Sequence, residues 1–402
     1  MRSETLAMPR ARASAALVQA KPLASVRFAF IDNLRILLVS LVILHHLAVA
    51  YGGEGSWYYR EGQADTITTM VLTLFVVFNQ AFFMALYFAI AGYFVPRSLE
   101  RKETRRFLMD RFLRLGVPLA FQLLVVGPLL GFGLAVNVWG FDGTLWTYLA
   151  QYVGHHPGAD SGPLWFVQAL LIFSVGYALW WGLARPEACA AKGATTAPGN
   201  GAIAVFALAV GLATFVVRIW LPVGWTFVPL NFQFPHFAQY ICLFAAGTIS
   251  YRRGWLSAIS RDAARGRLWG RLVAFLIAVA PVLFVVGGAL EGNTAPFRGG
   301  LSWQALTYAL WEQFVCVGMV ISLLVWFRKH HDHQNLLARA LSASAYAVYV
   351  FHGPILVLVS LGLRSVAWHP LLKLALASLI CLPACFTVGG LVKKLPLAEK
   401  IL

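Results

Sequence analysis

Residues 30–51 read FIDNLRILLVSLVILHHLAVAY, an apolar stretch with a short polar group at its start and two histidines near its end. An apolar run of about 20 residues crosses the hydrocarbon core of a bilayer as one helix. The rest of the chain has the same character, because 59% of its 402 residues are hydrophobic and only 12% are charged. Soluble domains carry a charge at roughly a quarter of their positions. The composition therefore excludes a soluble enzyme and indicates an integral, multi-pass membrane protein.

Apolar runs of similar length recur along the chain, which predicts an all-α protein with about ten transmembrane helices. The predicted spans are residues 30–51, 70–95, 112–135, 163–184, 201–221, 234–251, 271–290, 305–327, 341–363 and 369–392. We expect a basic cytoplasmic tail at 1–29, one ten-helix membrane domain at 30–392 and a short cytoplasmic tail at 393–402.

The formal net charge of +16 could indicate a nucleic-acid partner. Along the predicted topology, however, most of the 32 lysines and arginines fall in segments on one side of the membrane. The predicted outer loops hold only Arg60, Arg298 and Arg364. Because positive charge accumulates on the cytoplasmic side, we expect both termini in the cytoplasm. We also expect contact with anionic membrane lipids and no nucleic-acid partner.

Ionisable residues inside a span are costly and usually serve a pathway or a site. Arg35 and His46 are eleven residues apart, and eleven steps of 100° end about 20° from three full turns. The two side chains therefore share one helix face, with roughly 16 Å of rise between them. Asp32 precedes Arg35 by three residues, close enough for an i,i+3 ion pair. The pattern suits an elongated substrate; alternatively, Arg35 snorkels to the headgroups and His46 makes a hydrogen bond in the bundle.

Arg111 and Arg114 lie in a basic loop predicted at Pro96 to Pro118, which overlaps the start of the third predicted span. At i,i+3 on one helix face, two guanidinium groups form a fork that suits phosphate groups. The alternative is an anchor that holds the segment on the cytoplasmic side through its positive charge.

Four further ionisable residues fall at about the membrane depth of His46, namely Arg218, His236, Glu312 and His352. Arg218 and Glu312 either neutralise each other as a structural ion pair, or Glu312 orients the imidazole of His46. The sequence leaves both possibilities open.

Several short motifs follow one another in a fixed order along residues 30–392. They are Asp32-Asn33-Leu34-Arg35 with His46, Phe82-Phe83, Ala91-Gly92-Tyr93-Phe94, Arg111 and Arg114 ahead of Pro118, Leu164-Trp165-Phe166, and Ser344 to His352 with Tyr346 and Tyr349. In this ordered set the sequence resembles the membrane acyltransferase 3 family. One departure is visible, because Ala91-Gly92 stands where the family commonly has Ser-Gly, so any role of that serine hydroxyl is absent here.

The resemblance implies transfer of an acyl group, commonly acetyl or succinyl, from cytoplasmic acyl-CoA to a carbohydrate hydroxyl at the outer face of a bacterial inner membrane. It implies His46 as the catalytic residue, and Arg35, Arg111 and Arg114 as contacts of the acyl donor. The opening motif and the His45-His46 pair resemble most the periplasmic-glucan succinyltransferase branch.

The resulting hypothesis places acyl-CoA, as a co-substrate, at Arg35, Arg111 and Arg114, with Asp32 beside Arg35. His46 then acts as a general base or carries the acyl group itself. We expect no tightly bound cofactor and no metal, because His and carboxylate residues lack ligand-type spacing.

The other candidates belong to the acceptor side of the same hypothesis. Glu312 orients or stabilises the catalytic imidazole, and five residues line the site, namely Trp165, Arg218, His236, Tyr349 and His352. A polytopic transporter or exporter of an acylated or sugar metabolite is the alternative, because polar residues in the outer half of a helix bundle also describe a transport pathway.

Overall fold

The computed structural model describes residues 28–62, 64–155, 161–184 and 196–402. Almost the whole predicted N-terminal tail therefore lies outside the described residues. Within them, the regular structure is helical apart from one isolated bridge between Phe227 and Phe232. The predicted all-α class is confirmed.

Nine helices of the described chain are long and apolar enough to cross a bilayer. They are α1 (Ala29–Ala50), α2 (Thr66–Glu100), the continuous helix Thr104–Val138, the segment Gly162–Ala184 that contains α7 (Trp165–Ala184), α8 (Asn200–Trp220), α11 (Ala263–Val286), α13 (Trp303–His330), α14 (Leu336–Gly362) and α15 (Pro370–Val392). The protein is therefore an integral, multi-pass membrane protein. Each helix matches one predicted span, and the cytoplasmic placement of the termini stays a prediction.

The remaining predicted span, residues 234–251, corresponds to α9 (Phe237–Arg253), with the short turn η5 (Phe234–His236) directly before it, and α9 is not among the nine helices that could cross a bilayer. At 17 residues α9 is shorter than the other spans, and two arginines end it. It packs along α2, where Gln239 donates a hydrogen bond of 2.6 Å to the carbonyl of Ala81. Burial against α2 thus places this more polar helix in the bundle.

Three short helices connect longer ones, namely α6 (Leu145–His155), α10 (Trp255–Arg261) and α12 (Ala295–Arg298), and the short helix α16 (Ala398–Ile401) follows α15. The basic segment before the third span, predicted as a loop, is largely helical. Helix α2 continues through Pro96 to Glu100, and the next helix begins at Thr104.

The helix Thr104–Val138 is not uniform. It consists of α3 (Thr104–Arg111), the π-turn η1 (Phe112–Gly116), α4 (Val117–Phe121), the π-turn η2 (Gln122–Val126) and α5 (Gly127–Val138). Pro118 has no N–H, so the carbonyl of Arg114 lacks its usual α-helical donor. The hydroxyl of Tyr346 on α14 donates to that carbonyl at 2.6 Å. The carbonyl group that Pro118 leaves without a helical donor therefore joins this helix to α14.

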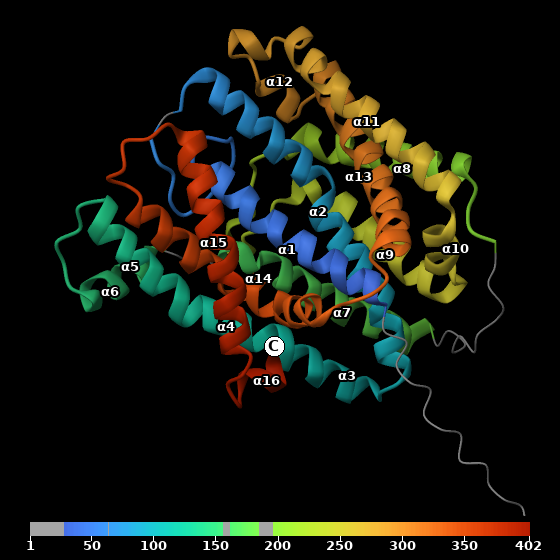
Figure 1. Ribbon diagram of the computed structural model, residues 1–402, viewed down its shortest axis with the longest axis horizontal. Coiled ribbons are helices and arrows are strands. Elements are labelled where there is room, and N and C mark those ends of the chain that lie inside the picture. The colour runs from blue at the N-terminus through green and yellow to red at the C-terminus, as the bar shows by residue number, and fades with distance from the viewer. Residues whose placement is uncertain (1–27, 63, 156–160, 185–195) are drawn as a thin grey trace, which may run out of the picture.

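Helix α1 runs through the middle of the bundle and packs against α2, α13, α14 and α15 (Figure 1). Leu34, Leu38, Ile43 and Leu47 are fully buried along it. A helix covered on several sides holds its polar side chains at fixed positions relative to four neighbours. The polar side chains of α1 therefore have defined positions relative to the surrounding helices.

Helices α2 and α9 approach each other through two glycines. A Cβ on Gly92 would lie 2.2 Å from the carbonyl oxygen of Phe244, and a Cβ on Gly247 would lie 2.2 Å from that of Ala89. Small residues at such crossings let helix backbones come close inside a membrane. The Gly92 of the Ala91-Gly92 motif is therefore explained by packing.

We expect Gly247→Ala to destabilise the protein, because the added methyl group would overlap backbone atoms of α2 and overpacking costs about 1–3 kcal/mol. Thermal unfolding of the purified protein in detergent measures this loss as a lower Tm. The matched control is Gly176→Ala on α7, where no atom lies within 4 Å of an added Cβ. Equal Tm values for the two variants would contradict the close α2–α9 contact.

Candidate functional site

His46 lies near the end of α1 in contact with two aromatic rings from other segments. Its ring stacks on Trp57, which belongs to the loop after α1, with ring centroids 3.9 Å apart and planes 18° apart. The ring of His352 on α14 lies 5.4 Å from it, also at 18°. The structure thus brings together two of the histidines that the sequence placed at one membrane depth.

The neighbouring His45 points elsewhere. It is buried and stacks on Phe83 of α2, with centroids 5.1 Å apart. Its ring stands perpendicular to that of His46. Of the two adjacent histidines, His46 is the one that stacks on Trp57 of the loop after α1 and on His352 of α14.

Tyr349, one turn before His352, connects α14 to the segment ahead of α7. Its hydroxyl donates to the carbonyl of Pro163, and its own carbonyl lies 2.7 Å from Nδ1 of His352. Gly162 has φ +49°, a conformation that glycine adopts readily, and the hydroxyl of Tyr58 occupies the place where its Cβ would be. These contacts hold the loop, α7 and α14 together around the two histidines.

Three side chains at this site escaped the sequence analysis. Trp57 and Tyr58 lie in an aromatic loop with no motif, although Trp57 covers His46. Gln122 begins the π-turn η2, is buried, and donates to the hydroxyl of Tyr58 at 3.2 Å. An isolated glutamine inside an apolar helix was the available signal, because buried amides need partners.

At the other end of α1 the predicted ion pair forms. Nη1 of Arg35 lies 3.2 Å from Oδ1 of Asp32, and the guanidinium group lies 5.2 Å from the ring centroid of Phe94. The side chain of Arg35 is 37% exposed, so it remains accessible from outside the bundle.

Arg111 and Arg114 lie where the helix changes its winding. Arg111 ends α3 and Arg114 lies inside the π-turn η1, and the guanidinium fork stays a prediction. The guanidinium carbon of Arg111 lies 5.1 Å from the ring centroid of Phe107, and Arg114 is exposed. Both arginines lie in the segment predicted to face the cytoplasm.

A buried ion cluster forms between three other helical segments. Arg218 of α8, Glu312 of α13 and His236 of η5 are at most 3% exposed. Nη2 of Arg218 lies 2.7 Å from Oε2 of Glu312, and Nδ1 of His236 lies 3.4 Å from Oε1 of Glu312 and 3.1 Å from Nη2 of Arg218. The ion pair that the sequence left open is present.

Further contacts complete this cluster. Nε of Arg218 donates to the carbonyl of Pro235 at 3.2 Å, and Gln313 donates to Glu312 at 3.3 Å. Among the described residues, Glu312 contacts Arg218, His236 and Gln313 through its carboxylate, and no such contact reaches His46. Glu312 is therefore part of the ion cluster, and its catalytic role stays a prediction.

Trp165 belongs to a series of ring contacts that links the two polar centres. It stacks on Tyr240 with centroids 5.5 Å apart, and Tyr240 stacks on His236 at 6.2 Å. The next residue, Phe166, lies 6.4 Å from Trp165 and 5.8 Å from the ring of Tyr349. Aromatic side chains thus connect the ion cluster with the histidine pair.

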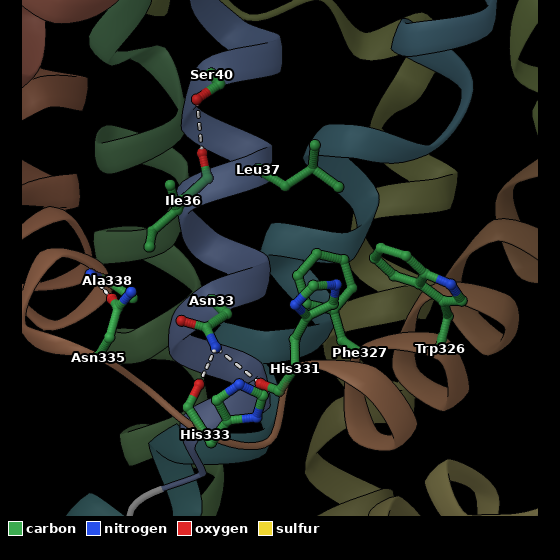
Figure 2. Close-up of a pocket in the computed structure, with 10 residues that line it drawn as sticks. All are labelled: Asn33, Ile36, Leu37, Ser40, Trp326, Phe327, His331, His333, Asn335 and Ala338. Atoms are coloured by element: carbon green, nitrogen blue, oxygen red, sulfur yellow. Dashed lines mark hydrogen bonds between the residues drawn. The ribbon is translucent and has the colours of Figure 1, made fainter.

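A pocket with a volume of about 650 Å³ lies toward the Asn33 end of α1 (Figure 2). Its lining residues are Asn33, Ile36, Leu37, Ser40, Trp326, Phe327, His331, His333, Asn335 and Ala338. On α1 these side chains lie roughly 150° around the helix from Arg35, so the pocket is on a different face from Arg35 and His46.

Asn33 has a structural role that the sequence analysis did not identify. Its Nδ2 donates to the carbonyls of His331 and His333 at 2.7 and 2.9 Å, which fastens the α13–α14 loop to α1 (Figure 2). In the part of the chain that the structure describes, no group of three His, Cys, Asp or Glu residues is placed to hold a metal ion.

Residues 28–390 match the acyltransferase domain of the acyltransferase 3 family. The chain belongs to this family. It is therefore a membrane acyltransferase, which decides between the two classes that the sequence left open in favour of an enzyme.

Curated relatives give a more distant match. Glucans biosynthesis protein C of Salmonella heidelberg (strain SL476) and the protein of the same name of Salmonella typhi are each 26% identical over 256 residues. The match covers 61% of this chain and 64% of each relative. No solved structure gives a significant match to the acyltransferase.

We expect Glu312→Gln to destabilise the acyltransferase strongly. The change leaves Arg218 buried without its counter-charge, and breaking a buried ion pair costs about 3–5 kcal/mol. Thermal unfolding in detergent measures the effect as a lower Tm.

The matched control is Glu54→Gln. Its partner Arg298 lies 3.7 Å away, both side chains are more than half exposed, and such pairs contribute about 0–1 kcal/mol. A Glu312→Gln variant that is as stable as wild type but has lost its activity would instead assign Glu312 to catalysis.

Proposed function

We propose that this acyltransferase moves an acyl group, acetyl or succinyl, from cytoplasmic acyl-CoA to a hydroxyl of a glucan-type carbohydrate outside a bacterial inner membrane. The position of His46 carries the proposal. It lies toward the predicted outer end of α1, beside His352 and under Trp57, in a chain that belongs to an acyltransferase family. The named function of the Salmonella relatives supports a glucan as the acceptor.

The donor enters from the cytoplasmic side in this proposal. Arg35, Arg111 and Arg114 are cations at the predicted inner end, where they bind the phosphates of acyl-CoA. From Arg35 the helix rises by roughly 16 Å to His46, a length that an extended pantetheine arm covers. The thioester carbonyl then lies beside the His46 imidazole.

The acceptor enters from the opposite side. Trp57 stacks on His46 from the predicted outer loop and shields it from water, which favours transfer to a carbohydrate hydroxyl over hydrolysis of the thioester. His46 serves this transfer as a base or as the carrier of the acyl group.

The first test is acyl transfer by the purified protein in liposomes, with radiolabelled acyl-CoA and a glucan acceptor. His46→Ala should lower ester formation by about 10²- to 10⁴-fold, the usual contribution of acid–base catalysis, while acyl-CoA still binds. His45→Gln is the matched control, because His45 packs on Phe83 instead of facing His352. If the wild-type protein forms no ester with any donor tried, the proposed function is wrong.

The second test concerns the donor site. Replacing Arg111 and Arg114 together by alanine should raise the Kd for acyl-CoA at least tenfold, because a hydrogen bond to a charged group contributes about 1.5–3 kcal/mol. Arg105→Ala with Arg106→Ala is the control, since these exposed arginines lie on the same basic segment. Equal affinity of both variants, with inverted insertion of the first, would assign Arg111 and Arg114 to membrane anchoring.

A further inference from the structure

His352 is held in one protonation form by its own helix. Its Nδ1 lies 2.7 Å from the carbonyl oxygen of Tyr349, and a carbonyl oxygen only accepts hydrogen bonds. Nδ1 therefore carries the hydrogen in the neutral ring, and Nε2 presents an unprotonated lone pair. A histidine oriented in this way, by a hydrogen bond to its second nitrogen, has the arrangement of a general base.

That lone pair has no donor in the described part of the chain. His352 is fully buried, and its Nε2 is without a hydrogen-bond partner there. An unsatisfied buried acceptor costs about 1–3 kcal/mol, so a bound molecule that donates a hydrogen bond to Nε2 would be favoured there. A hydroxyl group of a bound molecule can supply the hydrogen-bond donor that Nε2 of His352 lacks among the described residues.

His46 is arranged differently. Its Nδ1 is also buried without a partner among the described residues, so no described hydrogen bond on that nitrogen orients the ring as a base. Glu312, the acid that the sequence analysis assigned to the imidazole of His46, is engaged by Arg218 and His236. The oriented base of the site is therefore His352, which leaves His46 free to act as a nucleophile.

The surroundings of His352 belong to the acceptor side. Its ring lies 6.0 Å from that of Trp57, and Gly353 places the backbone beside Tyr58. Both aromatic residues come from the predicted outer loop. The ring of His46 is 5.4 Å away, so one small group can reach both imidazoles.

We propose that His352 is a second catalytic residue, the general base that takes the proton of the acceptor hydroxyl while His46 carries the acyl group. The inference rests on the proposed acyl-CoA-dependent transfer. In the first step, the unprotonated nitrogen of His46 attacks the thioester carbon and the C–S bond breaks. The leaving thiolate takes the proton from the other nitrogen of His46, which gives free coenzyme A and a neutral acyl-imidazole.

In the second step the acceptor oxygen attacks the acyl carbon, and Nε2 of His352 takes the hydroxyl proton. The C–N bond to His46 breaks, and His352 passes the proton to the nitrogen that leaves. The ester is released with both histidines neutral. The Tyr349 carbonyl stabilises the transient imidazolium, because hydrogen bonds from charged donors are stronger.

The test separates the two steps in His352→Asn. The asparagine amide can replace Nδ1–H as the donor to Tyr349, but nothing basic replaces Nε2. We expect a stoichiometric release of coenzyme A and radiolabelled acyl group retained on the protein, with transfer to the glucan lowered by about 10²- to 10⁴-fold. His352→Gln, which restores a polar group near Nε2 without a base, should show the same defect. His46→Ala should show no retained acyl group.

Two outcomes overturn the proposal. In the first, His352→Asn transfers the acyl group to the glucan at the wild-type rate. In the second, His352→Asn has an unchanged Tm but neither releases coenzyme A nor transfers the acyl group. Should His352→Asn fail to fold, His352→Gln with its Tm measured decides by the same criteria. Ester formation by the wild-type protein is measured in parallel. If it is absent, the proposed function fails; if it is present and His352→Asn transfers normally, only the role of His352 fails.

Discussion

The hydrocarbon core of a bilayer offers no hydrogen-bond partners, so every polar group at that depth must be satisfied by the protein or by a bound molecule. Helix α1 shows how this constraint organises the bundle. It carries an ion pair of Asp32 and Arg35, an amide that fastens the α13–α14 loop, and a histidine that meets α14. The ion pair lies within α1, whereas the amide and the histidine join α1 to the α13–α14 loop and to α14.

Two polar centres inside the bundle meet the constraint to different degrees. In the cluster of Arg218, His236 and Glu312, the charges of Arg218 and Glu312 compensate each other at 2.7 Å, while Nη1 of Arg218 and Oε1 of Glu312 have no hydrogen-bond partner among the described residues. At the histidine pair, buried ring nitrogens of His46 and His352 have no partner among the described residues. The ion pair stabilises the fold, whereas the histidine pair is suited to bind a molecule that supplies the missing partners.

Irregular backbone at the edge of the site also creates contacts between segments. Pro118 and the π-turns of the helix Thr104–Val138 disturb its regular backbone hydrogen bonding. One carbonyl group that lacks its usual donor, that of Arg114, accepts a hydrogen bond from Tyr346 of α14. Gly162 makes room for the hydroxyl of Tyr58, which also accepts from Gln122 at the second π-turn. Gly162 and the second π-turn thus lie where the loop after α1 meets the segment ahead of α7.

The sequence alone determined the membrane class, the position of the long helices and the Asp32–Arg35 pair, because apolar run length and i,i+3 geometry are local properties of the chain. It also identified His46, His352, Arg218 and Glu312 as ionisable residues that are costly inside a membrane and therefore belong to a site or a structural pair. Only the tertiary structure decided which of them meet: His46 with His352 and Trp57, and Glu312 with Arg218 and His236. A helix that is apolar on all sides carries no pattern that tells which face meets which neighbour. Close packing and the pairing of polar groups make that choice.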